Sequence, residues 1–231
     1  GTGVAVSKAT VVVTKDFGKE GLLKQTTGIE PGTTAMDALQ MVANVETKYG
    51  GGFVSTISGV SSEYWSANRS KEDWFFYING ISANTGALDY VLYPGDIEHW
   101  DFHNWGFHQF VPAIIGDFPE PFLHGYGGVA YPTIIAYQDG WGKNAEQIAY
   151  RLSQLGVASV STASINELQA GEKESSNLIL LGTIDCQLIE ELNQIWSKLG
   201  FYVHFQDNNL QVFTPKGDLA AEYRAGAGVI Q

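Results

Sequence analysis

The chain has 231 residues, of which 44% are hydrophobic and 16% are charged, a composition typical of a globular protein with a substantial core. Its formal net charge of −12 would repel nucleic acid and anionic membranes, so neither is expected as a partner. A single cysteine excludes a disulfide within one chain, and the lack of an apolar run of about 18 residues predicts no membrane span.

The first predicted domain covers residues 1–110 and consists mainly of strands. A β-branched run and the apolar stretch after it predict a hairpin, and Pro-Gly-Thr-Thr is typical of the start of a helix. In chain order, the expected elements are strands at 9–15 and 22–29, a helix capped by Thr33 or Thr34 and ended by glycines 50–52, and a strand at 53–60.

Two aromatic strands then follow, each next to a turn signal. Trp74-Phe75-Phe76-Tyr77 predicts a strand that runs into a tight turn at Asn79-Gly80. Pro94-Gly95-Asp96 predicts another turn, and a second aromatic strand begins just before Trp100. For both turns, the residue types favour a structural role over a functional one.

This order of aromatic strand, Asn-Gly turn, Gly-Asp and tryptophan resembles the C-terminal domain of transcobalamin and intrinsic factor. It also resembles uncharacterised bacterial surface proteins that share this domain, and the resemblance covers about residues 9–110. It implies a ubiquitin-like β-grasp fold and an exported, non-catalytic binding protein, with cobalamin or a related corrinoid as the first ligand to test. Transcobalamin's large helical domain has no counterpart here, so the second half of the chain would have to close a cleft over such a ligand.

Residues 111–130 contain three prolines and four glycines, which predicts a crossing between domains. Residues 131–231 alternate strand and helix patterns and predict a small α/β domain with a partly parallel sheet. The expected elements are strands at 133–137, 157–161 and 177–181, helices at 144–155 and 185–199, and a hairpin of 202–206 with 210–214 around Asp207-Asn208-Asn209. The predicted fold class is therefore α+β, a β-grasp domain followed by a small α/β domain.

The aromatic side chains supply most of the candidate ligand-binding residues. Tyr64 and Trp65 lie in a polar segment in which a core does not readily explain them. Trp141 and Thr183 follow strands of the second half, at the sheet end where α/β proteins bind ligands. The full set of candidates is Tyr64, Trp65, Trp74, Tyr77, His99, Trp100, His103, Trp105, Trp141 and Thr183.

The histidines near the second aromatic strand are weak candidates for a metal site. Residues four apart on a strand are separated by about 13 Å, so His99 and His103 cannot share an ion. Asp101 and His103 could be joined by His108 across a turn, or a histidine could line an organic-ligand pocket or ligate a corrinoid cobalt. The D-x-H-x-x-G signature of B12 enzymes is absent, because no aspartate stands two residues before His124.

Three classes of function remain open from the sequence. The leading interpretation is an extracellular or cell-surface binding protein for a corrinoid, whose signal peptide or anchor lies outside this chain, with no intrinsic cofactor. The alternative is a cell-surface interaction or adhesion module without a small-molecule ligand, because exposed aromatic residues suit protein interfaces. The third class is an enzyme with a metal at the histidines of residues 99–108. An enzyme is not expected, since neither G-x-S-x-G nor a Walker A motif occurs.

Overall fold

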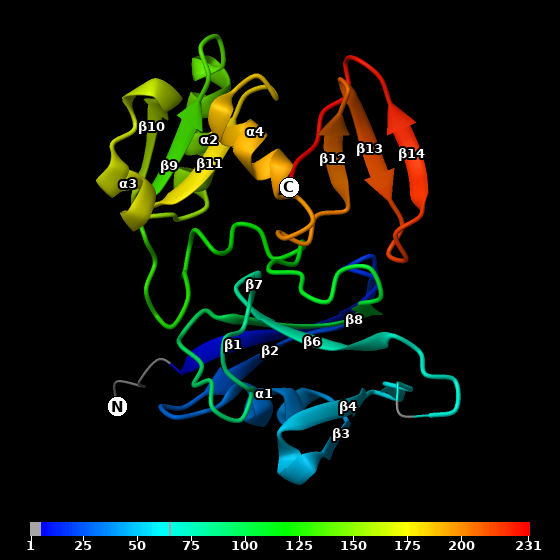
Figure 1. Ribbon diagram of the computed structural model, residues 1–231. Helices are drawn as coiled ribbons and strands as arrows, with labels where there is room; N and C mark the ends of the chain where they lie inside the picture. The colour runs from blue at the N-terminus through cyan, green and yellow to red at the C-terminus, as the bar shows by residue number, and fades with distance from the viewer. Residues whose placement is uncertain (1–5, 65) are drawn as a thin grey trace, which may run out of the picture. The chain divides into compact units, whose positions relative to one another are not determined.

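The computed structural model describes residues 6–64 and 66–231, and the chain divides into two compact units. The first unit comprises Gly1–Phe118 and Tyr126–Gly128, and the second comprises Pro119–Gly125 and Val129–Gln231. Both units combine sheets with a few helices, so the chain is a mixed α+β protein (Figure 1). Within the described residues, no helix combines the length and the apolar character that a membrane crossing requires.

The first unit is built on a five-stranded mixed sheet with the strand order β2-β1-β8-β6-β7 (Figure 1). Strand β1 pairs with β8 in parallel, and the other neighbours are antiparallel. The predicted hairpin and both aromatic strands are confirmed. The bounds are β1 (Ser7–Lys15), β2 (Glu20–Ile29), β6 (Glu72–Ile78), β7 (Ile81–Ser82) and β8 (Ile97–Asn104).

Helix α1 (Ala35–Val42) begins where the sequence predicts it but ends much earlier. Thr34 caps it, because its hydroxyl accepts from Asp37 N while the Asp37 carboxylate accepts from Thr34 N. The expected end at glycines 50–52 is wrong, because the β-branched residues after the helix favour a strand that pairs with β4. The bounds are β3 (Val45–Lys48), a 3-10 turn (Tyr49–Gly51), β4 (Phe53–Ile57) and β5 (Val60–Ser61).

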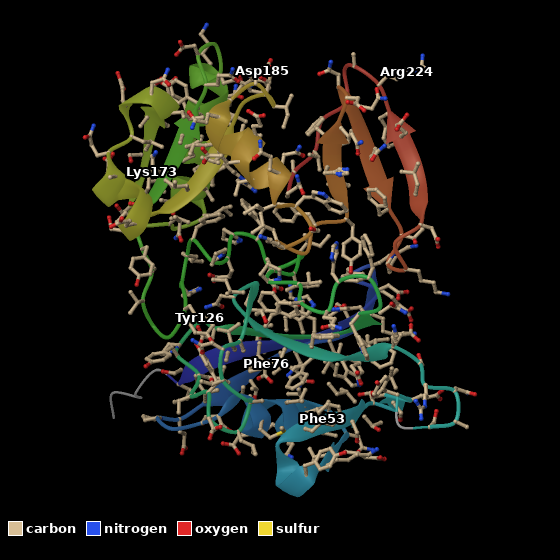
Figure 2. All side chains as sticks on the ribbon, viewed as in Figure 1. Phe53, Phe76, Tyr126, Lys173, Asp185 and Arg224 are labelled. Carbon is tan, nitrogen blue, oxygen red and sulfur yellow. The ribbon has the colours of Figure 1, made fainter. Side chains whose placement is uncertain are left out.

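One face of the five-stranded sheet packs on α1 and forms the main core (Figure 1). Strand alternation places Trp74 and Phe76 of β6 on this face, with Trp100 of β8 beside them. Phe76 stacks on Trp100 with ring centroids 4.9 Å apart, and Figure 2 labels Phe76 on this side of the sheet. Trp74 packs on Phe102 at 5.2 Å, so both strand tryptophans are core residues.

A buried polar contact joins the two turns of the aromatic motif. Asn79 and Gly80 have φ values of 50° and 78°, which confirms the predicted tight turn. The Asn79 amide donates to Asp96 Oδ1 at 2.8 Å, and Asn79 Oδ1 accepts from Ile97 N at 2.8 Å. Asp96 Oδ2 also accepts from Tyr93 N at 2.9 Å. The Asn-Gly and Pro-Gly-Asp turns therefore fix each other and set the register of β6 against β8.

The second unit contains a parallel three-stranded sheet, β10-β9-β11, with helix α2 packed on it through Ala145 and Leu152. A separate antiparallel sheet, β12-β13-β14, follows, and its first turn at Asp207 and Asn208 has positive φ values as predicted. The bounds are β9 (Thr133–Tyr137), α2 (Gly142–Gln154), β10 (Val160–Ser164), α3 (Ala170–Ser175), β11 (Asn177–Leu181), α4 (Gln187–Gln194), β12 (Val203–Gln206), β13 (Asn209–Phe213) and β14 (Leu219–Tyr223).

Most elements of the second unit match the sequence prediction, with β9 and β11 at the predicted residues. Four do not. The strand expected at 157–161 begins three residues later, and the helix expected at 185–199 ends at Gln194. Neither α3 nor β14 was predicted. Short, polar and exposed segments such as α3 carry little periodic signal, because no apolar face is needed to bury them.

The contact between Asn79 and Asp96 leads to a stability prediction. Replacing Asp96 by alanine leaves the buried Asn79 amide and Tyr93 N–H without their acceptor, so we expect a loss of about 3 kcal/mol. Urea unfolding followed by tryptophan fluorescence measures it. Asp89→Ala, which removes an exposed carboxylate, is the matched control and should change stability by less than about 0.5 kcal/mol. Equal stability of the two variants would contradict the structural role of Asp96.

Candidate functional site

The face of the sheet opposite α1 carries a row of buried polar side chains. Strand alternation places His99, Asp101 and His103 of β8 on this face, with Thr14 of β1 beside Asp101 in the parallel pairing. All four are buried, and Asp101 has 0% exposure. Since burying polar groups is costly unless they are hydrogen-bonded, each donor and acceptor in this row requires a partner.

A continuous chain of hydrogen bonds runs through the row. Asp117 Oδ2 lies 2.8 Å from His99 Nδ1, and His99 Nε2 lies 2.7 Å from Thr14 Oγ1. Thr14 Oγ1 donates to Asp101 Oδ1 at 2.5 Å, and His103 Nδ1 lies 2.7 Å from Asp101 Oδ2. The chain thus joins β1, β8 and residue 117, which are far apart in sequence.

Asp101 is the centre of this chain because it accepts from four donors. Besides Thr14 and His103, the backbone N–H groups of Phe17 and Gly18 donate to it, each at 2.9 Å. Both residues have positive φ, and this turn after β1 aims successive N–H groups at the carboxylate. Burial alone would raise the pKa of Asp101, but the hydrogen bonds from His103, Thr14 and Gly18 outweigh it and hold the pKa below its ordinary value.

His103 is enclosed by two phenyl rings. Its ring stacks on Phe75 and Phe17, with centroids 4.1 and 4.3 Å away. Nδ1 donates to the Asp101 carboxylate, whereas Nε2 is buried and has no hydrogen-bond partner among the described residues. A proton on Nε2 would be a buried donor without an acceptor, so the arrangement favours neutral His103 with its proton on Nδ1.

The hydrogen bonds of Thr14 also determine that His99 carries a proton on Nε2. Thr14 gives its only hydroxyl hydrogen to Asp101, so Thr14 Oγ1 can only accept from His99 Nε2. His99 Nε2 therefore carries a proton, and a further proton lies between Nδ1 and Asp117 Oδ2. Both histidines are held as positioned donors.

A cavity of about 410 Å³ opens beside this chain, and we call it the β1–β2 cavity. Its lining includes Thr14 of β1, Gly21 and Lys24 of β2, His99 of β8 and Gly116. Gly21 lies opposite Thr14 in the strand pairing, and a Cβ there would meet no heavy atom of the described residues within 4 Å. Apolar side chains, Val12, Leu22, Leu23 and Ile115, supply much of the remaining wall. The volume lies in the range of small-molecule sites.

The hydrogen-bond directions limit the chemistry of this site. Asp117, His99 and Thr14 are arranged like an acid–base–nucleophile triad, with distances of 2.8 and 2.7 Å. However, Thr14 donates its proton to Asp101, and His99 Nε2 already carries one, so His99 cannot take the hydroxyl proton. The arrangement suits a rigid binding wall better than a nucleophile.

The weak metal-site candidates Asp101, His103 and His108 do not form a metal-binding group. Among residues 6–64 and 66–231, no three His, Cys, Asp or Glu side chains are grouped so that they could hold an ion. The reason is visible at Asp101, whose two oxygens already accept four hydrogen bonds. His99 likewise has both ring nitrogens engaged.

The predicted ligand-binding residues of the sheet lie on different faces. Trp74 and Trp100 belong to the core against α1, whereas His99 and His103 belong to the polar row. Tyr77 is also on the polar face, opposite His99, and its hydroxyl donates to Val111 O at 3.0 Å. Of this group, the structure places His99 at the β1–β2 cavity.

The remaining candidates are found elsewhere. Tyr64 contacts Trp105 with ring centroids 5.2 Å apart, and Trp105 Nε1 donates to Asp73 Oδ2 at 2.8 Å. Trp65 lies outside the described residues. In the second unit, Trp141 precedes α2, and Thr183 donates through its N–H and hydroxyl to Gln138 Oε1. A role for each of these residues in ligand binding stays a prediction.

Sequence reasoning missed Thr14, Gly21 and Asp117. Thr14 sits in a β-branched run in which its hydroxyl resembles one more strand residue, and Gly21 resembles an ordinary hairpin residue. Asp117 lies in the proline-rich and glycine-rich stretch that was expected to be a crossing. One usable signal was present, because the alternation that places His99, Asp101 and His103 on one face also requires polar partners for them.

A second buried carboxyl group, Glu98, lies on the opposite face of β8. It has 0% exposure, its Oε1 accepts from Trp100 Nε1 at 2.6 Å, and its Oε2 has no partner among the described residues. Burial raises the pKa of Glu98 to about 8, and the hydrogen bond from Trp100 opposes this only in part. Glu98 is therefore mostly protonated at neutral pH, in contrast to Asp101.

Residues 32–104 match a family described as a domain of unknown function (DUF4430). The matched segment is less than half of the chain and contains α1, both aromatic strands and both turns of the motif. No curated protein matches the chain.

Two solved structures show a loose resemblance to this chain. One is a protein from Ruminococcus gnavus ATCC 29149, provisionally described as metal binding, with 14% identity, a TM-score of 0.31, and coverage of 42% of this chain and 95% of that one. The other is haptocorrin in complex with Cbi, with 15% identity, a TM-score of 0.33, and coverage of 44% of this chain and 26% of that one. At these values, neither protein's ligand informs the site in this chain.

The raised pKa of Glu98 predicts a pH-dependent stability. The folded state holds this proton up to about pH 8, whereas an unfolded glutamate releases it near 4.5, so Glu98 costs stability as pH rises from about 4.5 to 8. Glu98→Gln stays neutral, so its stability relative to the wild type should rise between pH 5 and pH 8.5, by on the order of 3 kcal/mol. Urea unfolding at both pH values measures it. A difference that does not change with pH would show that Glu98 is not held protonated.

Proposed function

We propose that this protein is a non-catalytic, extracellular or cell-surface binding protein that holds a small molecule in the β1–β2 cavity. The observation that carries the proposal is the cavity itself, about 410 Å³ in volume, with partly apolar walls and with Thr14 and His99 held in place by a buried hydrogen-bond chain. Apolar walls with a few fixed polar groups are typical of small-molecule sites. The lack of a free nucleophile at Thr14 favours binding over catalysis.

A corrinoid is the first ligand class to test, on the basis of the aromatic motif. The strand order β2-β1-β8-β6-β7, with β1 parallel to β8 and α1 on one face, is also the order expected of a β-grasp domain. We therefore propose that the first unit is a β-grasp domain like the one that the motif implies. A whole corrinoid is larger than the cavity, so only a part of it, such as an amide side chain, would enter.

A second candidate function is protein contact at the cell surface. Phe110, Ile115 and Phe118 are large apolar residues in one short segment, and they are 59%, 77% and 62% exposed. Exposed apolar side chains gathered in one segment are typical of interaction surfaces. Because Ile115 also lines the β1–β2 cavity, this candidate predicts a protein partner whose binding depends on Phe110 and Phe118.

The proposal is tested by titration with cyanocobalamin and cobinamide, followed by equilibrium dialysis and the corrinoid absorbance spectrum. We expect saturable binding at micromolar concentration or below. Gly21→Met should weaken it at least tenfold, because the added side chain enters the cavity without a clash. The matched control, Gln25→Met, adds the same side chain on the opposite face of β2 and should bind like the wild type.

Two other outcomes are informative. Binding that both variants retain would place the corrinoid outside the β1–β2 cavity. Absence of binding by either compound at high concentration would overturn the corrinoid assignment.

A further inference from the structure

We infer that the polar wall of the β1–β2 cavity selects a ligand that presents a hydrogen-bond donor, such as an amide N–H or an ammonium group, and that it rejects a carboxylate. The inference rests on the proposed binding function of this cavity and specifies the chemistry of its ligand. It follows from the positions of the hydrogen atoms in the row of hydrogen bonds that joins Asp117, His99, Thr14, Asp101 and His103.

Asp101 can only accept hydrogen bonds, because it is an ionised carboxylate. Its four donors and its lowered pKa hold it ionised. Thr14 must therefore donate its hydrogen to Asp101, and it must accept the hydrogen on His99 Nε2. No hydrogen of Thr14 remains for a ligand.

Thr14 Oγ1 nevertheless keeps the capacity to accept a second hydrogen bond, since a hydroxyl oxygen has two lone pairs. His99 offers the ligand neither a donor nor an acceptor nitrogen, because Nδ1 and Nε2 are both occupied. Its Cε1 atom is the nearest atom, at 3.9 Å, to a Cβ placed on Gly116. The only hydrogen bond that these two side chains can offer a ligand is thus one that the ligand donates.

The charge of the hydrogen-bonded row also favours a ligand that donates a hydrogen bond over a carboxylate. With the proton of His103 on Nδ1 alone, as its unpartnered Nε2 favours, and one proton shared between Asp117 and His99, Asp101 leaves one negative charge behind the wall. No Lys or Arg side chain among the described residues forms an ion pair with Asp101. A carboxylate at Thr14 would lie close to this charge and would be repelled by it. Among the lining residues, the exposed Lys24 carries a positive charge, so an anionic group would be drawn to Lys24 rather than to Thr14.

The rest of the wall defines the body of the ligand. Val12, Leu22 and Ile115 present apolar surface, and the glycines at 21 and 116 leave space without adding polar side chains. The ligand class is therefore an apolar group that ends in an N–H or O–H donor.

Three probes with the same four-carbon tail test the inference: pentanamide, 2-hexanone and pentanoate. Pentanamide and 2-hexanone are neutral and nearly identical in shape, but only the amide can donate. Affinities of such small probes are measured from backbone amide shifts of Gly21 and Gly116 in two-dimensional NMR titrations. The amide should bind with the lowest Kd and pentanoate with the highest.

Variants at Thr14 test whether the cavity prefers pentanamide because of a hydrogen bond to Thr14 or because amides bind better for other reasons. Thr14→Val keeps the shape but removes the acceptor, so the affinity of pentanamide relative to 2-hexanone should fall by about threefold to tenfold. Thr14→Ser keeps the acceptor and should preserve the ratio. Because the comparison uses a ratio of two neutral probes in the same variant, a change of overall stability does not alter it.

The outcomes distinguish this inference from the proposed function. Shifts that Gly21→Met abolishes, with pentanoate equal to or better than the amide, would overturn the donor inference and leave the binding site intact. A ratio that is unchanged in Thr14→Val would also overturn it. Absence of saturable shifts at Gly21 and Gly116 with any of the three probes would overturn both the inference and the cavity as a binding site.

Discussion

The four hydrogen bonds that Asp101 accepts are the constraint on which the polar half of the first unit depends. They satisfy a carboxylate with 0% exposure, hold the turn after β1 against the sheet, and fix the hydrogens of Thr14 and His103. Through Thr14 they also fix His99, which positions residue 117. One wall of the cavity is therefore preorganised, because moving any of these side chains would leave a buried polar group unsatisfied.

Strand β8 carries a buried carboxyl group on each face, and the two groups differ in their protonation state. On the α1 side, a hydrogen bond from Trp100 offsets only part of the cost of burying Glu98, so Glu98 stays protonated near neutral pH. On the other side, Asp101, only three residues away, stays ionised because donors surround it. The contrast shows that several hydrogen-bond donors can outweigh the cost of burial and let a carboxyl group keep its charge. The β1–β2 cavity lies on the Asp101 side of the sheet, beside Thr14 and His99, and this favours that side as the functional face.

Sequence patterns predict those parts of this fold that depend on local periodicity. The hairpin, the aromatic strands, the Asn79-Gly80 turn and β9 were found because each has an alternation or a turn signal of its own. The end of α1 was not, since the pairing of β3 with β4 overrides the expected helix. The site was found only in part for the same reason. His99 was identified from its strand, but its partners Thr14 and Asp117 are 85 and 18 residues away, and only the folded chain brings them together.

The most direct test of this account is the protonation of the two buried histidines, read from the ¹⁵N chemical shifts and long-range ¹⁵N–¹H couplings of the imidazole rings at neutral pH. We expect a proton on Nε2 of His99 and, for His103, the neutral form with its proton on Nδ1 and a bare Nε2. His103→Gln assigns the signals. A proton on Nε2 of His103, or a bare Nε2 on His99, would contradict the hydrogen-bond directions from which the donor-selecting wall is derived.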